Sequence, residues 1–525
     1  MHAERAPTYF WESHPRTPIR VCLKALYGII FRLCVHSLAN LIQLVLRQVA
    51  TQNSMPADKE TPEIKSAKVS LINLGCAKNE VDSEEMLGLL AQEGYRIESR
   101  HGAGDISGDT DVVIINTCGF IDAAKEESIN TILEALERKK NGTVKRVVVA
   151  GCLAQRYAGD LAKELPDVDA FLGTGSISSI SRVVGQTLVP ERGLIRTSQL
   201  MEIAEKPHHR WVNTPTRARI GAPWTAYLKI SEGCDHACTF CAIPSFRGRH
   251  ISKPMEDILA EAKGLAEQGV RELNLIAQDS TQYGYDLYGS MKLPELLKEL
   301  SVIDGVHWIR LFYCYPSRVN RGVIEAIATT PKVCHYIDMP LQHADNDMLR
   351  LMRRPMTYDG YIKLLEEFRT AAPDVSIRTT FIVGFPGESP ARFNTLKRFV
   401  EEAQFDRVGV FEFSVEDGTP SADMKPQVSP KTRAARKAAI MELQQPISLA
   451  RNQAWVGREM EILIEGRSSV DVTTAIGRSF RDAPEVDGKV YVRRCTAKPG
   501  TFVRAKVVEA RPYDLVAELV SSAAV

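Results

Sequence analysis

Blocks of apolar and polar residues alternate along the chain from Lys68 onward. Three short runs rich in Val and Ile are typical of buried strands: residues 68–76, 111–120 and 145–152. Helical stretches follow the first two runs, at residues 83–94 and 124–140. In the second helical stretch four residues recur at the spacing of one helical face: Ile129, Ile132, Leu133 and Leu136. This alternation predicts an α/β domain built on a parallel sheet.

The middle of the chain repeats the alternation on a larger scale. Six further apolar runs predict strands: residues 225–231, 272–279, 308–316, 336–342, 377–385 and 407–414. Helical stretches such as residues 255–269 and 358–372 separate them. The six strand–helix repeats predict a partial (β/α)6 barrel, with its site at the carboxyl ends of the strands.

The last part of the chain has shorter elements. Strands at residues 459–466, 489–494 and 501–510 predict a small antiparallel β-domain. A basic helix over residues 433–453 is expected to be a solvated connector. The chain is therefore expected to contain four parts: an extension over residues 1–66, the α/β domain over 67–190, the barrel over 220–447 and the β-domain over 448–520.

The first residues differ from the rest. Residues 19–50 are apolar, but five basic side chains interrupt them: Arg20, Lys24, Arg32, His36 and Arg47. A spanning helix needs about 20 nearly uncharged residues, and no such window exists here. We expect no membrane partner, with a peripheral amphipathic helix or a targeting extension as the alternative. The regular pattern begins only near Lys68. We expect residues 1–66 to be a disordered extension or a misassigned start, with Met55 as the true first residue.

Composition limits the class of protein. Of the 525 residues 44% are apolar and 25% charged, as in globular proteins, and a net charge of +1 does not by itself indicate a polyanionic partner. Eleven cysteines without a secretory signal argue against a disulfide framework. Metal or redox chemistry in the reducing cytoplasm is favoured.

Three cysteines follow three predicted strands of the α/β domain. Cys76, Cys118 and Cys152 stand 42 and 34 residues apart, each beside a glycine at a strand exit. The carboxyl ends of parallel strands lie along one edge of a sheet, where α/β domains bind ligands. Burial as three core thiols is the alternative. The convergence favours a three-thiolate metal site.

Three more cysteines are close in sequence. Cys234, Cys238 and Cys241 lie in "CDHACTFC", directly after the first strand of the predicted barrel. Thiolates are the usual ligands of iron–sulfur clusters, and three of them would leave the fourth iron open to a substrate. A zinc site completed by His236 or His250 is the alternative.

The spacing in "CDHACTFC", including the aromatic Phe240, resembles the radical S-adenosylmethionine enzymes. The resemblance implies that a 4Fe–4S cluster on Cys234, Cys238 and Cys241 binds S-adenosylmethionine at its open iron and cleaves it reductively to a 5′-deoxyadenosyl radical. It also implies contacts to S-adenosylmethionine from the strand ends and the turn at residues 383–389: Phe240, Gln278, Asp279, Gln342, Gly384 and Gly387. His343, beside Gln342, lies on the same rim. No general base is identified.

With the upstream cysteines, residues 67–520 resemble the methylthiotransferases, whose C-terminal domain is of the TRAM type. The resemblance implies a second 4Fe–4S cluster on Cys76, Cys118 and Cys152, two molecules of S-adenosylmethionine, an electron donor such as flavodoxin or ferredoxin, and a sulfur donor. We expect a cytoplasmic monomer. A non-catalytic iron–sulfur carrier is the alternative, but a carrier needs no barrel.

The acceptor separates two branches of this family. "NTCGFI", residues 116–121, resembles the branch that modifies an aspartate of small-subunit ribosomal protein S-twelve, rather than the branch that modifies a tRNA adenosine. Residues 457–525 carry 11 Lys and Arg against 10 Asp and Glu, which is a weak basic balance for an RNA-binding domain. Arg493, Arg494, Arg504 and Lys506 could still form a local basic patch. The remaining cysteines are expected to be buried or incidental: Cys22, Cys34, Cys314, Cys334 and Cys495.

Overall fold

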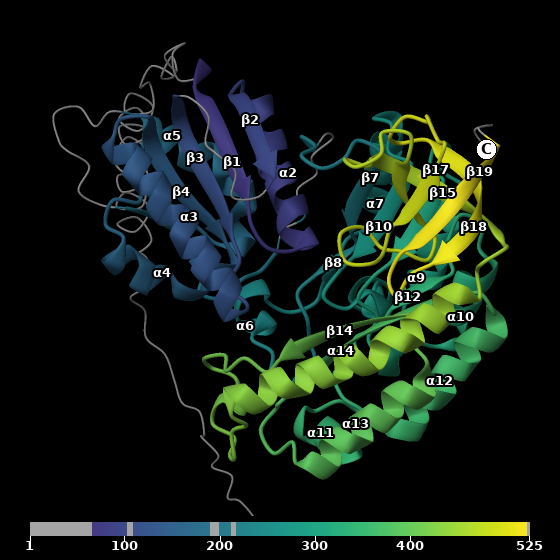
Figure 1. The fold of residues 1–525 in the computed structure, drawn as a ribbon. Helices are drawn as coiled ribbons and strands as arrows, with labels where there is room; N and C mark the ends of the chain where they lie inside the picture. Colours follow the sequence, from purple (N-terminus) through teal and green to yellow (C-terminus); the bar gives the residue numbers. More distant parts are fainter. Residues whose placement is uncertain (1–65, 102–108, 190–198, 210, 212–216, 522–525) are drawn as a thin grey trace, which may run out of the picture. The chain divides into compact units, whose positions relative to one another are not determined.

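A computed structural model describes residues 66–101, 109–189, 199–209, 211 and 217–521, all within one compact unit that spans residues 63–525. Figure 1 shows its elements in chain order, from the purple α/β domain through the green barrel to the yellow C-terminal barrel. The expectations for residues 1–65, including the start at Met55 and the thiols of Cys22 and Cys34, lie outside the described residues. Among the described helices, none combines the length and the apolar character that crossing a membrane requires.

The α/β domain is a parallel six-stranded sheet, as predicted, in the order β2-β1-β3-β4-β5-β6. Its strands are β1 (Lys68–Asn73), β2 (Arg96–His101), β3 (Thr110–Thr117), β4 (Val144–Gly151), β5 (Ala170–Leu172) and β6 (Leu200–Glu202). Its helices are α2 (Ala77–Gln92), α3 (Asp122–Lys140), α4 (Cys152–Glu164) and α5 (Ile180–Leu188), with a 3-10 turn η2 (Thr174–Ser179). Because β6 belongs to this sheet, the predicted domain boundary at residue 190 is too early.

Alternate residues of each strand pack on opposite faces of the sheet. Val113 and Val147 contact the side covered by α3 and α4, whereas Val112 and Val148 contact the side covered by α2 and α5. This two-sided burial explains the continuous apolar runs in the sequence.

The predicted apolar face of α3 is only half right. Ile132 is fully buried, but Ile129 and Leu133 are 37% and 48% exposed. The helix turns Ser128 and Ala135 toward the sheet instead, because small side chains allow the helix to pack closely against it.

The barrel has the six predicted strands. They form two parallel three-stranded sheets, ordered β11-β10-β7 and β12-β13-β14. The strands are β7 (Thr225–Lys229), β10 (Glu272–Ile276), β11 (Trp308–Leu311), β12 (Tyr336–Asp338), β13 (Ser376–Val383) and β14 (Arg407–Glu412). A single bridge between Ile309 and Val333 joins the two sheets, so the partial (β/α)6 barrel is confirmed.

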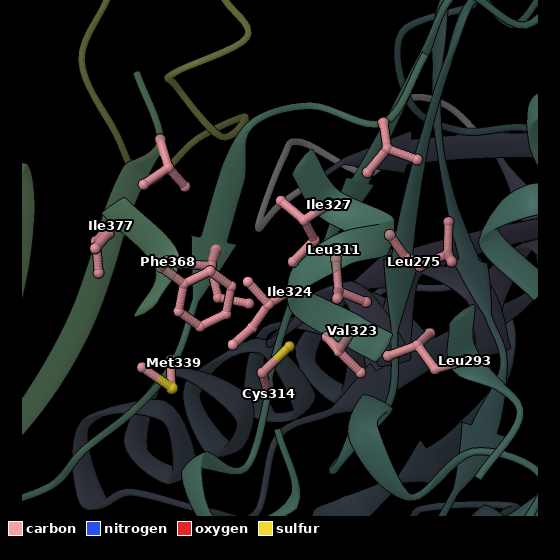
Figure 2. Packing of buried hydrophobic residues seen from close by; sticks show 14 of the residues in the cluster. Leu275, Leu293, Leu311, Cys314, Val323, Ile324, Ile327, Met339, Phe368 and Ile377 are labelled. Carbon is pink, nitrogen blue, oxygen red and sulfur yellow. The ribbon is translucent and has the colours of Figure 1, made fainter. Parts of the chain in front are cut away.

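Helices cover the outside of these strands. They are α7 (Met255–Glu267), α8 (Tyr285–Tyr288), α9 (Leu293–Ser301), α10 (Arg321–Thr329), α11 (Asn346–Leu351), α12 (Tyr358–Ala371) and α13 (Pro390–Ala403). Short elements fill the loops: β8 (Ser231–Glu232), α6 (Ile243–Arg247), β9 (Ile251–Ser252), η3 (Ser280–Gln282), η4 (Pro316–Arg318) and η5 (Pro420–Ala422). Figure 2 shows the apolar layer between strands and helices, where Leu275 and Leu311 meet Val323 and Ile324 of α10.

The C-terminal part is a closed five-stranded barrel, ordered β15-β16-β17-β19-β18. Its strands are β15 (Glu459–Arg467), β16 (Ala475–Ser479), β17 (Val490–Arg493), β18 (Phe502–Ala510) and β19 (Leu515–Ser521). The pairs are antiparallel except β17 with β19. This is the small β-domain that the sequence predicts.

Helix α14 (Pro430–Gln453) is not the solvated connector that its basic sequence suggests. One face is fully buried against the barrel, and it consists of Ile440, Gln444, Ser448 and Asn452. The polar members of this face have partners: Gln444 Nε2 donates to the carbonyl of Phe405 at 2.8 Å. Arg436, one turn before Ile440, is also buried and pairs with Glu388, so net composition concealed a packing helix.

Replacing Ile440 tests this packing. Ile440→Ala should lower the free energy of unfolding by about 2 to 5 kcal/mol, because the side chain is fully buried and leaves a cavity. Thermal unfolding of the purified protein measures the change. Gln445→Ala, an exposed neighbour on the same helix, is the control. Equal midpoints for the two variants would contradict a packed α14.

Candidate functional site

The structure brings Cys76, Cys118 and Cys152 to one edge of the first sheet. Cys76 directly precedes α2, Cys118 follows β3 and Cys152 begins α4 after β4. A Cβ atom built on Gly75 would lie 3.0 Å from the Cβ and 3.5 Å from the Sγ of Cys118, and one on Gly119 would lie 2.8 Å from the carbonyl carbon of Cys152. The loops therefore touch where the thiols lie.

Gly151 makes one of these strand exits possible. Its φ is +95°, and a Cβ atom there would lie 2.3 Å from Asn116 Oδ1 and 2.7 Å from the Thr117 carbonyl. Only glycine tolerates both the left-handed backbone and this close approach. The neighbouring glycines of the sequence pattern are thus required by the convergence of the loops.

The three thiols differ in exposure. Cys76 is exposed, Cys118 half-buried and Cys152 buried. Burial raises the pKa of Cys152 to about 12 and also raises the pKa of Cys118, while the nearby Arg247 guanidinium acts in the opposite direction. Bound cations favour the thiolate form that metal binding requires.

Arg247 at the end of α6 contacts this first set of thiols from the barrel. Its Nε donates to the Cys152 Sγ at 3.3 Å, and its Nη2 donates to Asn79 Oδ1 at 2.6 Å. Its Nη1 reaches Asp82 of α2 at 2.7 Å and Glu232 of β8 at 3.2 Å. One fully buried side chain thus joins the two domains at the thiols.

Lys229 at the end of β7 completes this cluster of charges. Its Nζ forms ion pairs with Asp82 and, at 3.1 Å, with Glu232. The four side chains Asp82, Lys229, Glu232 and Arg247 are all buried, and we refer to them as the junction cluster. Glu232 stands two residues before Cys234, so the junction cluster links the two sets of cysteines.

The second set lies on the loop after β8. Cys234, Cys238 and Cys241 are half-buried, and burial raises the pKa of Cys234 and of Cys241 to about 12. The backbone N–H of Cys241 donates to the carbonyl of Cys238 at 3.2 Å, which folds the loop back on itself. Arg354 Nη1 lies 3.9 Å from the Cys238 Sγ.

Within the described ranges, no three His, Cys, Asp or Glu side chains are arranged to hold one metal ion. His236 is engaged with Asp279 at 2.7 Å and stacks on Tyr315, and His250 contacts Ser252 at 3.1 Å. Both histidines that could complete a zinc site thus contact neighbouring side chains.

The residues expected to contact S-adenosylmethionine lie around the barrel rim and differ in their hydrogen bonds and packing. Gln278 donates to Glu232, and its Oε1 is buried without a partner. Both carboxylate oxygens of Asp279 have hydrogen-bond partners, because they accept from His236 and from the backbone N–H of Thr281. Phe240 packs against an apolar group that includes Met348 and Phe385. Only Gln278 among these keeps a free polar atom for a ligand.

The other rim residues form a braced turn. Gln342 has a φ of 73°, and its backbone pairs with β13. His343 lies 3.1 Å from Glu388, which also accepts from the backbone N–H of Gly384 and pairs with Arg436 at 2.6 Å. Gly384 and Gly387 both have positive φ, and a Cβ atom on Gly384 would lie 2.4 Å from Arg433 Cγ. The turn is thus held from α14 at the edge of the barrel.

The residues of α2 that reach the barrel were not expected from the sequence. The apolar pattern predicts a helix that begins at residue 83, but α2 begins at Ala77. Its first residues include Lys78, Asn79 and Asp82, all of them buried. The available signal was the run of polar residues directly after Cys76, a candidate ligand. Polar residues usually stay exposed, so a polar run at such a position indicates contacts with another part of the chain.

The remaining described thiols are structural, as expected. Cys314 lies in the apolar layer of the barrel, Cys334 lies in a smaller cluster, and Cys495 lies in the core of the C-terminal barrel.

Comparisons with known proteins agree with this architecture. Residues 68–173 match the uncharacterized protein family UPF0004, residues 228–400 the radical SAM superfamily, and residues 456–520 the TRAM domain. The chain is 45% identical over 452 residues to ribosomal protein uS12 methylthiotransferase RimO of Desulforamulus reducens, covering 86% of this chain and 99% of that protein. The enzyme of the same name from Geobacter sulfurreducens is 44% identical over 454 residues, again covering 86% and 99%.

A solved structure is similar in fold alone. The radical S-adenosylmethionine methyltransferase TsrM from Kitasatospora setae has a TM-score of 0.50 and 14% identity, covering 68% of this chain and 77% of that chain.

The junction cluster predicts a large effect of Arg247→Met. The substitution leaves two buried carboxylates to a single lysine, and an uncompensated buried charge costs about 3 to 5 kcal/mol. The matched control is Arg249→Met, whose side chain is 89% exposed and pairs with Asp235, and which should cost at most about 1 kcal/mol. Chemical denaturation measures both. Similar stabilities would show that the junction cluster does not join the domains.

Proposed function

The chain belongs to the family of ribosomal protein uS12 methylthiotransferases, and on this premise we propose that it adds a methylthio group to the β-carbon of an aspartate in uS12. The enzyme is a radical S-adenosylmethionine methylthiotransferase. The observation that supports the proposal most is the junction cluster, because it links one set of three cysteines to another. A reaction that both activates a carbon and delivers sulfur needs two such centres.

We propose that Cys234, Cys238 and Cys241 hold one 4Fe–4S cluster and that Cys76, Cys118 and Cys152 hold a second. When bound, the clusters and S-adenosylmethionine supply the radical, the sulfur and the methyl group. The protein orients these groups and excludes water. Gln278, Asp279, Gln342 and the turn at Gly384 and Gly387 are the proposed surroundings of S-adenosylmethionine, with Phe240 behind the cluster loop.

The described residues around these proposed centres hold a ligand thiol in place and offer no free histidine base. Arg247 directs a hydrogen bond at the Cys152 sulfur, and such a donor fixes a thiolate ligand and tunes its cluster. Hydrogen abstraction from an aspartate β-carbon needs no strong base, in keeping with a site whose histidines are engaged with neighbouring side chains.

The architecture supports a division into three domains. We propose domains at residues 66–202, 217–453 and 454–521, because β6 belongs to the first sheet and α14 packs on the barrel. The proposed setting is a cytoplasmic monomer that receives electrons from a flavodoxin- or ferredoxin-type donor and sulfur from a separate donor.

The surface of the C-terminal barrel favours a protein acceptor over tRNA. Three of the four basic residues expected to form a patch are paired with carboxylates: Arg493 with Glu509 at 3.2 Å, Arg494 with Glu518 at 3.9 Å and Arg504 with Glu459 at 2.9 Å. Pairing reduces the positive charge available to a phosphate backbone.

The acceptor is tested directly in cells. The intact mass of uS12 should increase by one methylthio group in cells that carry the gene and not in cells that lack it, with tRNA nucleosides measured from the same cultures. A missing methylthio nucleoside beside an unchanged uS12 would assign the enzyme to tRNA.

The two cysteine sets should separate two activities. Cys238→Ala should abolish cleavage of S-adenosylmethionine to 5′-deoxyadenosine, whereas Cys118→Ala should preserve cleavage and abolish sulfur insertion. Each variant should lose the iron of one cluster. Cys495→Ala, a buried thiol of the C-terminal barrel, is the control that should keep both activities. Loss of cleavage in Cys118→Ala would argue against two distinct centres.

A further inference from the structure

Lys78 is a buried cation that no carboxylate neutralises. It is the second residue of α2, two residues after Cys76, and only 7% of it is exposed. Its Nζ lies 3.1 Å from the ring centroid of Tyr313. Within the part of the chain that the structure describes, this nitrogen forms no ion pair and no hydrogen bond, and it is not among the buried polar atoms that lack a partner, so it stays accessible from outside.

Other buried cations of this region behave differently. Lys229 pairs with two carboxylates and Arg247 with two, and Arg310 pairs with Glu272 at 3.1 Å. An ammonium carries three donors, and burying it without an acceptor is costly. The donors of Lys78 are therefore free to bind an anionic group that arrives from outside the chain.

The two carboxylates whose charges act on Lys78 already have partners. Asp338 accepts from the backbone N–H of Tyr313 at 3.1 Å and pairs with Arg378 at 2.8 Å. Glu232 pairs with Lys229 and Arg247. Neither forms an ion pair with the lysine, so its ammonium has no carboxylate partner within the described residues.

Tyr313 fixes where the ammonium lies. This residue follows β11 at the carboxyl end of the barrel strands, with a φ of 57°. Its backbone is held on both sides, because its N–H donates to Asp338 and its carbonyl accepts from the Ser280 N–H at 3.0 Å. The ring face holds the ammonium by a cation–π contact. Lys78 thus presents its charge at the barrel rim, beside the loop of Cys76.

We propose that Lys78 is a positioning residue that binds the side-chain carboxylate of the acceptor aspartate. The inference rests on the proposed function. A carboxylate held by the ammonium places the adjacent β-carbon at the barrel rim, beside the cysteine set that begins with Cys76. The charged contact also distinguishes aspartate from a neutral isostere such as asparagine, because the amide lacks the negative charge.

The test is a double-mutant cycle on binding. Wild-type enzyme and the Lys78→Gln variant, both with reconstituted clusters, are titrated with uS12 that carries either its acceptor aspartate or asparagine in its place. Wild type should bind the aspartate form at least about tenfold more tightly, as expected for a charged hydrogen bond, and Lys78→Gln should bind both forms equally. Lys78→Arg should keep part of the preference.

Controls separate this contact from a structural role. Lys163→Gln, an exposed lysine of the same domain, should retain the full preference for aspartate. Iron content and S-adenosylmethionine affinity are measured in Lys78→Gln beside the uS12 titration, because loss of iron would assign the lysine to the cluster on Cys76 rather than to the acceptor.

Several outcomes would overturn the inference. Equal weakening of both uS12 forms by Lys78→Gln would make the lysine a general structural contact. Weaker binding of S-adenosylmethionine would assign the ammonium to the carboxylate of that molecule. A wild-type enzyme that modifies uS12 but binds the aspartate and asparagine forms equally would remove the inference alone, whereas a wild type that leaves uS12 unmodified in cells would remove the proposed function as well.

Discussion

The buried ion pairs of the junction cluster are the constraint on which the site depends. Asp82 of the α/β domain pairs with Arg247 of the barrel. Lys229 also pairs with Asp82, and Glu232 also pairs with Arg247. Buried charges are tolerated only when their partners are held in place, so this cluster permits few arrangements of the α/β domain on the barrel. Because Arg247 also contacts Cys152 and Glu232 adjoins the loop of Cys234, the same contacts set the relation between the two cysteine sets.

The rest of the fold supports this junction from two directions. Parallel strands bring the first cysteines to one edge, and Gly151 permits the close approach there. At the opposite ends of the barrel strands, buried ion pairs attach the C-terminal barrel: Glu272 with Arg478 at 2.6 Å, and Asp406 with Arg481 at 2.9 Å. The chemistry and the accessory domain thus use opposite ends of the strands, which leaves the rim available to ligands.

The sequence predicted the parts with strong local signals. Strand runs, the glycines beside Cys76, Cys118 and Cys152, and the spacing of "CDHACTFC" are all local patterns. The junction cluster could not be predicted, because Asp82 and Arg247 meet across 165 residues and only the packed domains bring them together. Helix α14 was misjudged for a related reason: its buried Gln444 and Ser448 are polar in composition, but they hydrogen-bond to each other within the folded protein. Lys78 was missed because its burial depends on Tyr313, which belongs to another domain.

We propose that two iron–sulfur centres lie on either side of the junction cluster. An anomalous difference map at the iron edge, from crystals of the reconstituted protein, would locate them. Two separate four-iron peaks are expected, one bound by Cys76, Cys118 and Cys152 and the other by Cys234, Cys238 and Cys241. A single iron peak at the barrel loop, with the first three thiols unligated, would contradict the proposal.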